Sequence, residues 1–434
     1  MPSELKKALL TSAQTALQAE DLDSILHDEL MKLQPLAQML DVVQAESKTH
    51  EYNVRTSHPQ GWFEGETTPM AQKSGTYSRK TVQLKIQRIW GGVTGFAQAV
   101  DEKFIDALST ELEGSVEGMA DLMEYGALFG TADDIGFTGD PYQYSGLLPR
   151  LFAYAPANVI DAGGNKLVLD DLDAAVAKAA GFRQVRNDPR IWIMGLRMKQ
   201  VADGLQSKVS LPLQDAILDD GKIVMPAYAG APIYESDSVV PESTTTSPDA
   251  THVKAAGGAL PDETYSYQIS SVTMYGEQVH GAAGTDATTE TTNNSVDITW
   301  TADANALAYM IFRQVGGTGD YFLLDIIPAL TYDSAGTVNG SVEAYSDEGA
   351  LTPSTTVKPL EAGEQQIVLI NAKASRGGAF VGMVDDMGRQ IGKLLSFVEL
   401  ARVKDSYDYM LKSYLAFKLV HPNVNAVIRH VKIA

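Results

Sequence analysis

Cysteine is absent from the 434-residue sequence, which excludes disulfides, thiol nucleophiles and zinc–thiolate centres. No run of 18 apolar residues occurs either, so no membrane-spanning helix is predicted. The first 22 residues are amphipathic and carry acids, and they lack the apolar central stretch of a secretory signal. These absences argue against a membrane protein and against a secreted one.

The motifs of common enzyme classes are missing as well. The sequence has no HExxH, GxSxG or GxxxxGK[ST] pattern, and the glycine-rich stretch "SRGGAFVG" (375–382) lacks the lysine of a phosphate-binding loop and indicates a tight turn. Its seven histidines are scattered without metal-ligand spacing, and its paired aspartates are explained by helix caps and turns. We therefore predict no catalytic residue, no cofactor and no metal site, and a non-enzymatic assembly or binding protein.

Positive charge is scarce overall and unevenly placed. The net charge is −21, from 34 basic and 55 acidic residues. Residues 241–350 hold 15 acids and two bases, and residues 98–129 hold eight acids and one base. By contrast, residues 67–100 contain five bases and no acid, and residues 401–434 contain six bases and two acids. Such blocks are either solvated faces or complementary surfaces of an assembly.

Two early segments alternate apolar and polar side chains in the manner of β-strands. They are residues 48–56 and 80–89, and a segment containing Gly and Pro separates them. This pattern predicts a long two-stranded arm with a broad tip. Because a lone hairpin is only marginally stable in water, we expect the arm to lie on another surface.

The rest of the chain, apart from one segment, mixes helical and strand patterns. Apolar residues at spacings of three and four predict helices at residues 4–19, 21–43, 98–129, 170–180, 197–205 and 384–395. The helix at 170–180 is expected to begin at Asp170 as its capping residue. Short buried strands are expected at 190–195 and 231–240. This mixture predicts an α+β protein.

The composition changes at Pro241. Residues 241–263 and 347–364 have the composition of linkers. Between them, short strand-like segments alternate with turns, which is typical of a β-sandwich, and Trp300 and Tyr309 are its expected core aromatics. Since the mixed pattern resumes afterwards, the sandwich is an insertion into a larger domain.

The order of these parts resembles one protein family. An N-terminal arm, a basic hairpin, a long acidic helix, the loop "GDPYQYSGLL" and a last strand "HPNVNAVIRHVKI" follow one another as in the major capsid proteins of tailed bacteriophages. The resemblance implies the Hong-Kong-97 type capsid fold. The insert resembles the immunoglobulin-like or fibronectin-like modules found on phage surfaces.

The resemblance implies a division of the chain into five parts. These are an N-terminal arm (1–47), an extended loop (48–92), a peripheral domain with a spine helix (93–186 and 402–434), an axial domain (187–240 and 358–401) and the inserted module (241–357). The insert, with its excess of acids, is expected to be an independently folded module on two flexible linkers.

The implied function is that of a structural protein of the virion. Its hexamers and pentamers would self-assemble in the host cytoplasm into the icosahedral head, which encloses DNA without sequence-specific binding. Fewer than 50 residues precede the hairpin, so a separate scaffolding protein is expected. A portal protein and decoration proteins are further implied partners. An encapsulin-like compartment shell and a sandwich-based surface-binding or adhesion protein remain alternatives.

The two strongest charge blocks suggest where subunits meet. In the family, the extended loop lies across an adjacent subunit, close to its spine helix. We therefore expect contacts between four cations and four acids, namely Arg79, Lys80, Lys85 and Arg88 of one copy and Asp106, Glu113, Glu117 and Asp121 of the next. The alternative is that both faces point to water.

Overall fold

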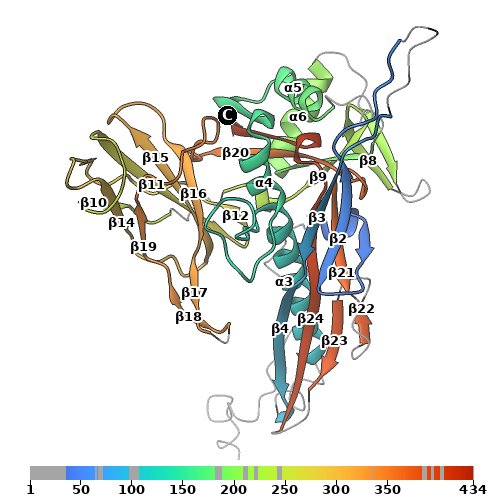
Figure 1. Ribbon diagram of the computed structural model, residues 1–434. Coiled ribbons are helices and arrows are strands. Elements are labelled where there is room, and N and C mark those ends of the chain that lie inside the picture. Colours follow the sequence, from blue (N-terminus) through green and yellow to red (C-terminus); the bar gives the residue numbers. More distant parts are fainter. Residues whose placement is uncertain are drawn as a thin grey trace, which may run out of the picture.

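Three units and a projecting hairpin make up the chain (Figure 1). The computed structural model describes residues 36–63, 66, 72–96, 107–180, 188–208, 214–218, 223–241, 247–334, 336–383, 389–391, 395–400 and 405–433. The units are an elongated sheet with a long helix, a seven-stranded sheet with two helices, and a sandwich that stands to one side. Helices and strands are both abundant, which confirms the α+β class.

The start of the described chain differs from the predicted helix at 21–43. The helix predicted at 4–19 and most of the second one lie outside the described residues. The described part contains one helical turn, α1 (Leu36–Met39), followed by the strand β1 (Val42–Gln44). The prediction that the helix continues to residue 43 is wrong, since α1 ends at Met39. The residues that follow form β1, because they pair in parallel with β21 (Gly378–Met383), a strand more than 330 residues away in the sequence.

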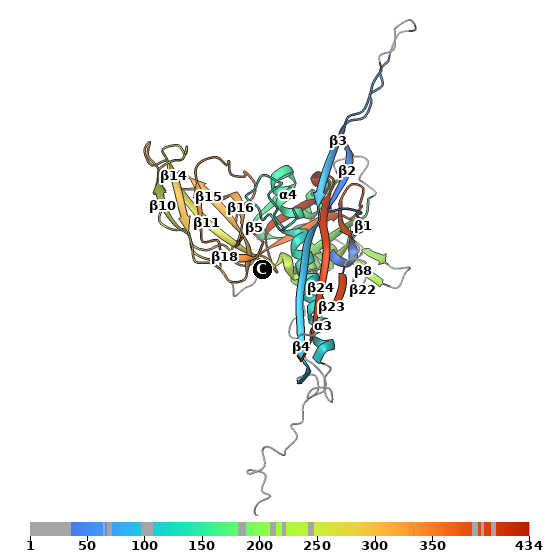
Figure 2. The same cartoon turned by 60° about the horizontal axis from the view of Figure 1, so that its bottom comes forward.

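The predicted two-stranded arm is confirmed. β2 (Thr49–Arg55) and β3 (Tyr77–Gln83) form an antiparallel hairpin that projects from the body (Figure 2). The strand expected at 80–89 is interrupted, however, at Leu84, whose N–H donates to the Lys48 carbonyl. The chain then changes partners, and β4 (Lys85–Thr94) pairs with the long strand β24 (Ser406–Leu419). Alternation continues through such a break, so the sequence pattern does not reveal it.

The spine unit consists of a six-stranded sheet and the helix α3 (Ala107–Leu128). Its strand order is β1-β21-β24-β23-β22, with β4 on β24, β22 being Arg389–Ile391 and β23 Leu395–Glu399. Of the helix predicted at 98–129, the part before 107 lies outside the described residues. Met119 and Met123, one turn apart, are buried against the sheet, as the predicted apolar stripe requires.

The helix predicted near 384–395 is wrong in the residues that the structure describes there. Those residues belong to β22 and β23, which pair as a hairpin and continue onto β24. Pairing between these consecutive strands overrides the local apolar spacing. The tight turn predicted in "SRGGAFVG" is confirmed: the N–H groups of Arg376 and Gly377 both donate to the Lys373 carbonyl.

The loop after α3 returns to the end of that helix. Residues 131–146 lead to α4 (Leu147–Tyr154), and the Gly146 N–H donates to the Gly130 carbonyl at 2.6 Å. A Cβ atom at Gly146 would lie 2.8 Å from the Gly126 carbonyl oxygen, so only glycine permits this approach. Leu147, Leu148 and Leu151 of α4 are completely buried. A 3-10 turn (Pro156–Asn158) follows.

The second unit is built on a seven-stranded sheet of order β5-β25-β20-β6-β9-β8-β7. Its strands are β5 (Val159–Lys166), β6 (Arg190–Met194), β7 (Gln214–Leu218), β8 (Ile223–Tyr228), β9 (Ala231–Glu235), β20 (Glu364–Asn371) and β25 (Ala426–Lys432). Helices α5 (Leu169–Ala179) and α6 (Leu196–Lys208) pack with it. Trp192, on β6, lies at the centre of this core.

Two predicted boundaries in this unit need correction. The helix at 170–180 begins at Leu169, after Val168, whose N–H donates to the Asp171 carboxylate. The strand predicted to reach 240 ends at Glu235, and a 3-10 turn, Asp237–Val239, follows. β5 and β25 belong to the seven-stranded sheet, whereas β21 to β23 belong to the sheet of the spine unit.

The predicted sandwich is present. One sheet has the order β10-β14-β19, and the other has the order β12-β11-β15-β16 with β13 on β11. The strands are β10 (Thr251–Ala255), β11 (Thr264–Thr273), β12 (Gly276–Glu277), β13 (Ala287–Thr288), β14 (Ser295–Thr299), β15 (Ala306–Val315), β16 (Phe322–Pro328) and β19 (Ala344–Asp347), with a hairpin of β17 (Leu330–Tyr332) and β18 (Val338–Ser341). Trp300 and Tyr309 pack edge to face in its core, as predicted.

The two flexible linkers are not what the structure contains in the described residues. In the first predicted linker, residues 251–255 form β10 and pair with β14. In the second, Val357 and Leu360 are completely buried. The prediction of flexible linkers relied on the turn-forming residues of these segments. It overlooked Val357 and Leu360, whose buried side chains fix the second segment in place.

Candidate assembly surface

The predicted cations lie on two consecutive strands but have different surroundings. Arg79, on β3, forms an ion pair with Glu51 on the neighbouring strand of the same hairpin. Lys85, at the start of β4, donates to the Pro141 carbonyl in the loop after α3. Lys80 and Arg88 are exposed. Burial of the Lys80 stem and the nearby Arg150 guanidinium lower the pKa of Lys80.

The predicted acids follow one stripe of α3, and their exposure falls along it. Glu113 and Glu117 are one turn apart and exposed, whereas Asp121 is half-buried. Asp106 lies outside the described residues. Both β4 and β24 lie beside α3 in the same chain, and the Ser115 hydroxyl of α3 is 2.8 Å from the Tyr409 hydroxyl of β24. No described ion pair joins Lys80 or Arg88 to Glu113 or Glu117 within one chain.

A strip of side chains on the far side of the spine sheet from α3 was missed by the sequence reading. Three cross-strand pairs of β4 and β24 form this outer strip: Ile86 with Tyr414, Arg88 with Lys412, and Trp90 with Met410. Trp90 is 73 % exposed and Ile86 is 66 % exposed. Exposed apolar side chains gathered on one face of a sheet are typical of a surface that contacts another molecule. The alternation Ile86, Arg88, Trp90 was the available sequence signal.

The tip of the arm also carries exposed aromatic side chains. Phe63 is completely exposed, and Trp62 is 60 % exposed with the Lys73 ammonium 4.5 Å from its ring centroid. Tyr77, at the base of the tip, is 69 % exposed. Large aromatic side chains in water on a projecting hairpin are typical of a surface that binds another molecule.

One acid of the α3 block has a role that the sequence did not indicate. Glu124 is completely buried where α3 meets α1 and the turn at 237–239, and it accepts a hydrogen bond from the Ser236 hydroxyl. Burial raises the pKa of Glu124 to about 7, although hydrogen bonds from Ser236 and Ser238 oppose the shift. The carboxyl group is therefore favoured in its protonated form in the folded protein at acidic pH.

We expect Glu124→Gln to stabilise the protein at alkaline pH. The folded-state pKa lies above the unfolded value, so the wild type loses stability as the pH rises from about 4.5 to about 7 and no further above that. An amide does not titrate, so the variant should match the wild type near pH 4.5 and exceed it by up to about 3 kcal/mol above pH 7. Urea unfolding at several pH values measures this difference. Glu111→Gln, at an exposed position of the same helix, is the control, and equal pH profiles of all three proteins would contradict the prediction.

The described residues contain no cluster of His, Asp or Glu that could hold a metal ion. A pocket of about 130 Å³ lies at the foot of the arm, and its lining includes Lys85, Asp134 and Arg150. Ser145 donates to Asp134, and the Arg150 guanidinium lies 3.8 Å from the same carboxylate, so these groups interact with one another. None of the helices in the described ranges is long and apolar enough to cross a membrane.

No protein-family model matches the sequence, and no curated protein matches it. Solved structures do match. A chain of the SrpI encapsulin complex of Synechococcus elongatus is 12 % identical, with a TM-score of 0.51, over 98 % of this chain and 95 % of that chain. The capsid of a native GTA particle (10 % identity, TM-score 0.48, 98 % of each chain) and a chain from Gordonia phage Cozz (10 % identity, TM-score 0.47, 96 % and 93 %) also align. The likeness to the encapsulin chain shows that this chain has the same fold.

Proposed function

We propose that this chain is the major capsid protein of a tailed bacteriophage, which self-assembles into the icosahedral head that encloses the DNA genome. The observation that carries the proposal is a shell-protein fold, shared with an encapsulin chain over nearly its whole length, with a projecting arm whose aromatic tip is exposed. The base of the arm contacts its own chain, where the Tyr52 hydroxyl donates to the Leu419 carbonyl, but Trp62 and Phe63 at the tip are exposed, and a neighbouring subunit would supply a surface for them.

The parts of the family fold are assigned to the observed units. The spine unit is the peripheral domain, the seven-stranded unit is the axial domain, and the β2–β3 arm is the extended loop. The sandwich is the immunoglobulin-like or fibronectin-like insert. Hexamers and pentamers build the shell, with a separate scaffolding protein, a portal protein and decoration proteins as partners. The protein is not an enzyme; it assembles in the host cytoplasm and resides in the virion.

An encapsulin-like compartment shell is the second candidate, because the fold likeness is to an encapsulin chain. The acidic sandwich favours the phage head over the compartment shell, because phage shells more often carry surface modules. Particle contents distinguish the two. Large shells that protect DNA from nuclease support the phage head, whereas small uniform shells filled with a cargo protein support the compartment. The excess of acids, 55 against 34 bases, argues against tight binding of DNA in either case.

The contact between subunits is proposed to join the arm side of one copy to the spine helix of the next. Lys80 and Arg88 are the cations that remain for this contact, because Arg79 and Lys85 have partners in their own chain. Glu113 and Glu117 are the exposed acids that they would meet, and the outer strip adds apolar contact. Each exposed pair contributes about 0.2–1 kcal/mol, so the pairs act through their number around every capsomer.

We expect a charge swap to test this contact. Lys80→Glu with Arg88→Glu should reduce the yield of shells, because like charges would face each other across the interface. Adding Glu113→Lys and Glu117→Lys should restore part of the yield, and all differences should shrink at high salt. Light scattering during assembly measures the yield. Lys166→Glu with Lys254→Glu is the control at other positions, and normal assembly of the first variant at low salt would disprove the contact.

A further inference from the structure

The inner sheet of the sandwich is buried on both faces. In β15, Tyr309 and Ile311 lie in the core between the two sheets of the sandwich, whereas Met310 and Phe312 lie in the core that contains α3 and α4. β16 divides its side chains between the same two cores. A strand with two apolar, buried faces is the middle layer of a stack, so this sheet belongs to the body as much as to the sandwich.

The sandwich holds the loop that follows the spine helix. The Thr138 N–H donates to the Asp325 carboxylate of β16 at 2.8 Å, and the Tyr332 hydroxyl donates to the Asp140 carboxylate at 2.8 Å. The Tyr142 and Tyr332 rings pack with their centroids 4.6 Å apart. The loop 131–146 is thus attached to β16 and to the β17 hairpin at three points.

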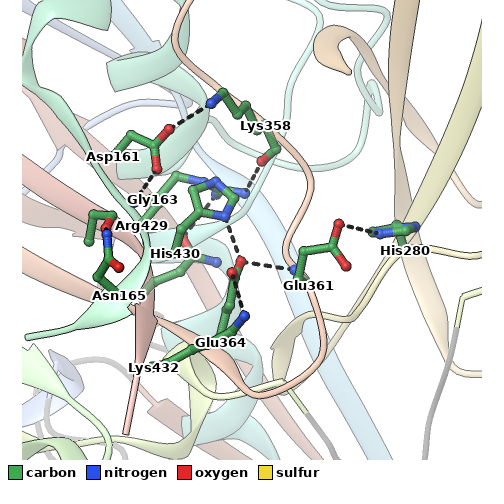
Figure 3. Close-up of polar contacts among 12 residues, drawn as sticks. Asp161, Gly163, Asn165, His280, Lys358, Glu361, Glu364, Arg429, His430 and Lys432 are labelled. Carbon is green, nitrogen blue, oxygen red and sulfur yellow. Dashed lines mark hydrogen bonds and ion pairs between the residues drawn. The ribbon is translucent and has the colours of Figure 1, made fainter. Parts of the chain in front are cut away.

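The sandwich also holds the edge of the seven-stranded sheet. Arg429, on β25, donates through two nitrogens to the two carboxylate oxygens of Glu277 on β12, each at 2.8 Å, and both side chains are completely buried. The Lys358 ammonium bridges two carboxylates. It lies 2.9 Å from Asp161 of β5 (Figure 3) and 3.0 Å from Asp320, in the loop between β15 and β16 of the sandwich. The bridge lies beside Arg429 in that view.

The segment that leads from the sandwich back into the sheet is fixed by further polar contacts. Glu364 accepts the Glu361 N–H at 3.0 Å and lies 2.6 Å from Nδ1 of His430 (Figure 3). His430 adopts a left-handed backbone conformation with φ of 59°, which a histidine adopts only where its surroundings impose it. Glu361 also pairs with His280 of the sandwich at 3.3 Å.

We propose that the inserted sandwich is an internal clamp, which fixes the spine unit relative to the seven-stranded unit. It contacts the loop at the end of α3 on one side and β25 on the other. If the two units rotated relative to each other, the sandwich would lose one of its two contacts. Either the buried Arg429 and Glu277 side chains would separate, or the apolar face of β15 and β16 would become exposed. This role replaces the expectation of an independently folded module on two flexible linkers, and it holds whether or not the chain builds shells.

Two buried tryptophans allow a direct test. Trp192 lies in the seven-stranded unit and Trp300 in the sandwich, so ¹⁹F NMR of the full chain labelled with 5-fluorotryptophan reports on both during urea unfolding. Single Trp→Phe variants assign the signals. The clamp predicts that both folded signals disappear at the same urea concentration. Separate transitions of the two signals would overturn the proposal.

Neighbouring residues of β15 sharpen the test. Ile311→Ala opens a cavity inside the sandwich, and Phe312→Ala opens one towards α3 and α4. If the sandwich acts as a clamp, each variant lowers the urea midpoint of the Trp192 signal and that of the Trp300 signal equally. In an independent module, Ile311→Ala would shift the Trp300 signal alone and leave the Trp192 midpoint unchanged, which would contradict the clamp. Val253→Ala, on the exposed face of β10, is the control and should shift neither signal.

Discussion

Replacing Arg429 by methionine should cause one of the largest losses of stability available in this chain, about 3–5 kcal/mol. The substitution leaves the Glu277 carboxylate completely buried and removes the two hydrogen bonds that balance its charge. The Gln366 amide alone, at 3.0 Å, cannot replace a bidentate guanidinium. Because domains are stable by only about 5–15 kcal/mol, much of the variant should be insoluble.

Urea unfolding of the soluble fraction measures this loss, and two further variants show its origin. The double variant Arg429→Met with Glu277→Met should recover most of the lost stability, because an apolar pair of similar volume replaces a buried ion pair at little net cost. Lys432→Met, which removes a partly exposed cation from the same strand, should change little. An unchanged urea midpoint in Arg429→Met would show that this ion pair does not hold the sandwich to the body.

Shortening the arm should abolish assembly and leave the fold intact. Thr56 and Thr76 are cross-strand neighbours, since the Thr56 N–H donates to the Thr76 carbonyl at 2.9 Å. Residues 57–75 can therefore be replaced by Asn-Gly, which favours the tight turn of a two-residue hairpin. The removed tip contains the exposed Trp62 and Phe63, so its loss removes the proposed contacts with neighbouring copies and no described core residue.

Thermal unfolding of the shortened chain should match the wild type, while electron microscopy should find no shells. Trp62→Ala with Phe63→Ala is a milder variant and should lower the shell yield in the same direction, because aromatic side chains usually dominate the energy of an interface. Wild-type shell yields from the shortened chain would refute a role of the arm in assembly.

The sequence predicted those features that depend on neighbouring residues. The alternation of apolar and polar residues predicted β2 and β3, and the apolar stripe with Met119 and Met123 predicted α3. The series of short strand-like segments separated by turns predicted the sandwich. The sequence did not predict that the chain changes its strand partner at Leu84, because alternation of apolar and polar residues does not indicate which strand lies alongside. It also missed the docking of the sandwich, since Arg429 and Glu277 are 152 residues apart in the chain.

For the candidate contact, too, the sequence predicted one part and the structure was needed for the rest. Charge counting identified the basic and acidic blocks, but only the structure distinguishes Arg79, which pairs within its hairpin, from Arg88, which is exposed. Glu124 belongs to the acidic block by sequence and yet is buried against Ser236. Which charges of a block face a partner depends on tertiary packing, and composition carries no information about it.

Electron microscopy of the concentrated, purified full-length protein tests the central claim most directly. We predict closed icosahedral shells, or the hexameric and pentameric rings that build them, with the arm-shortened chain as a negative control under the same conditions. The rings should show the arm of each subunit lying on its neighbour. A protein that stays monomeric at every concentration and in every salt condition, with the arm intact, would contradict the proposal that it is a capsid protein.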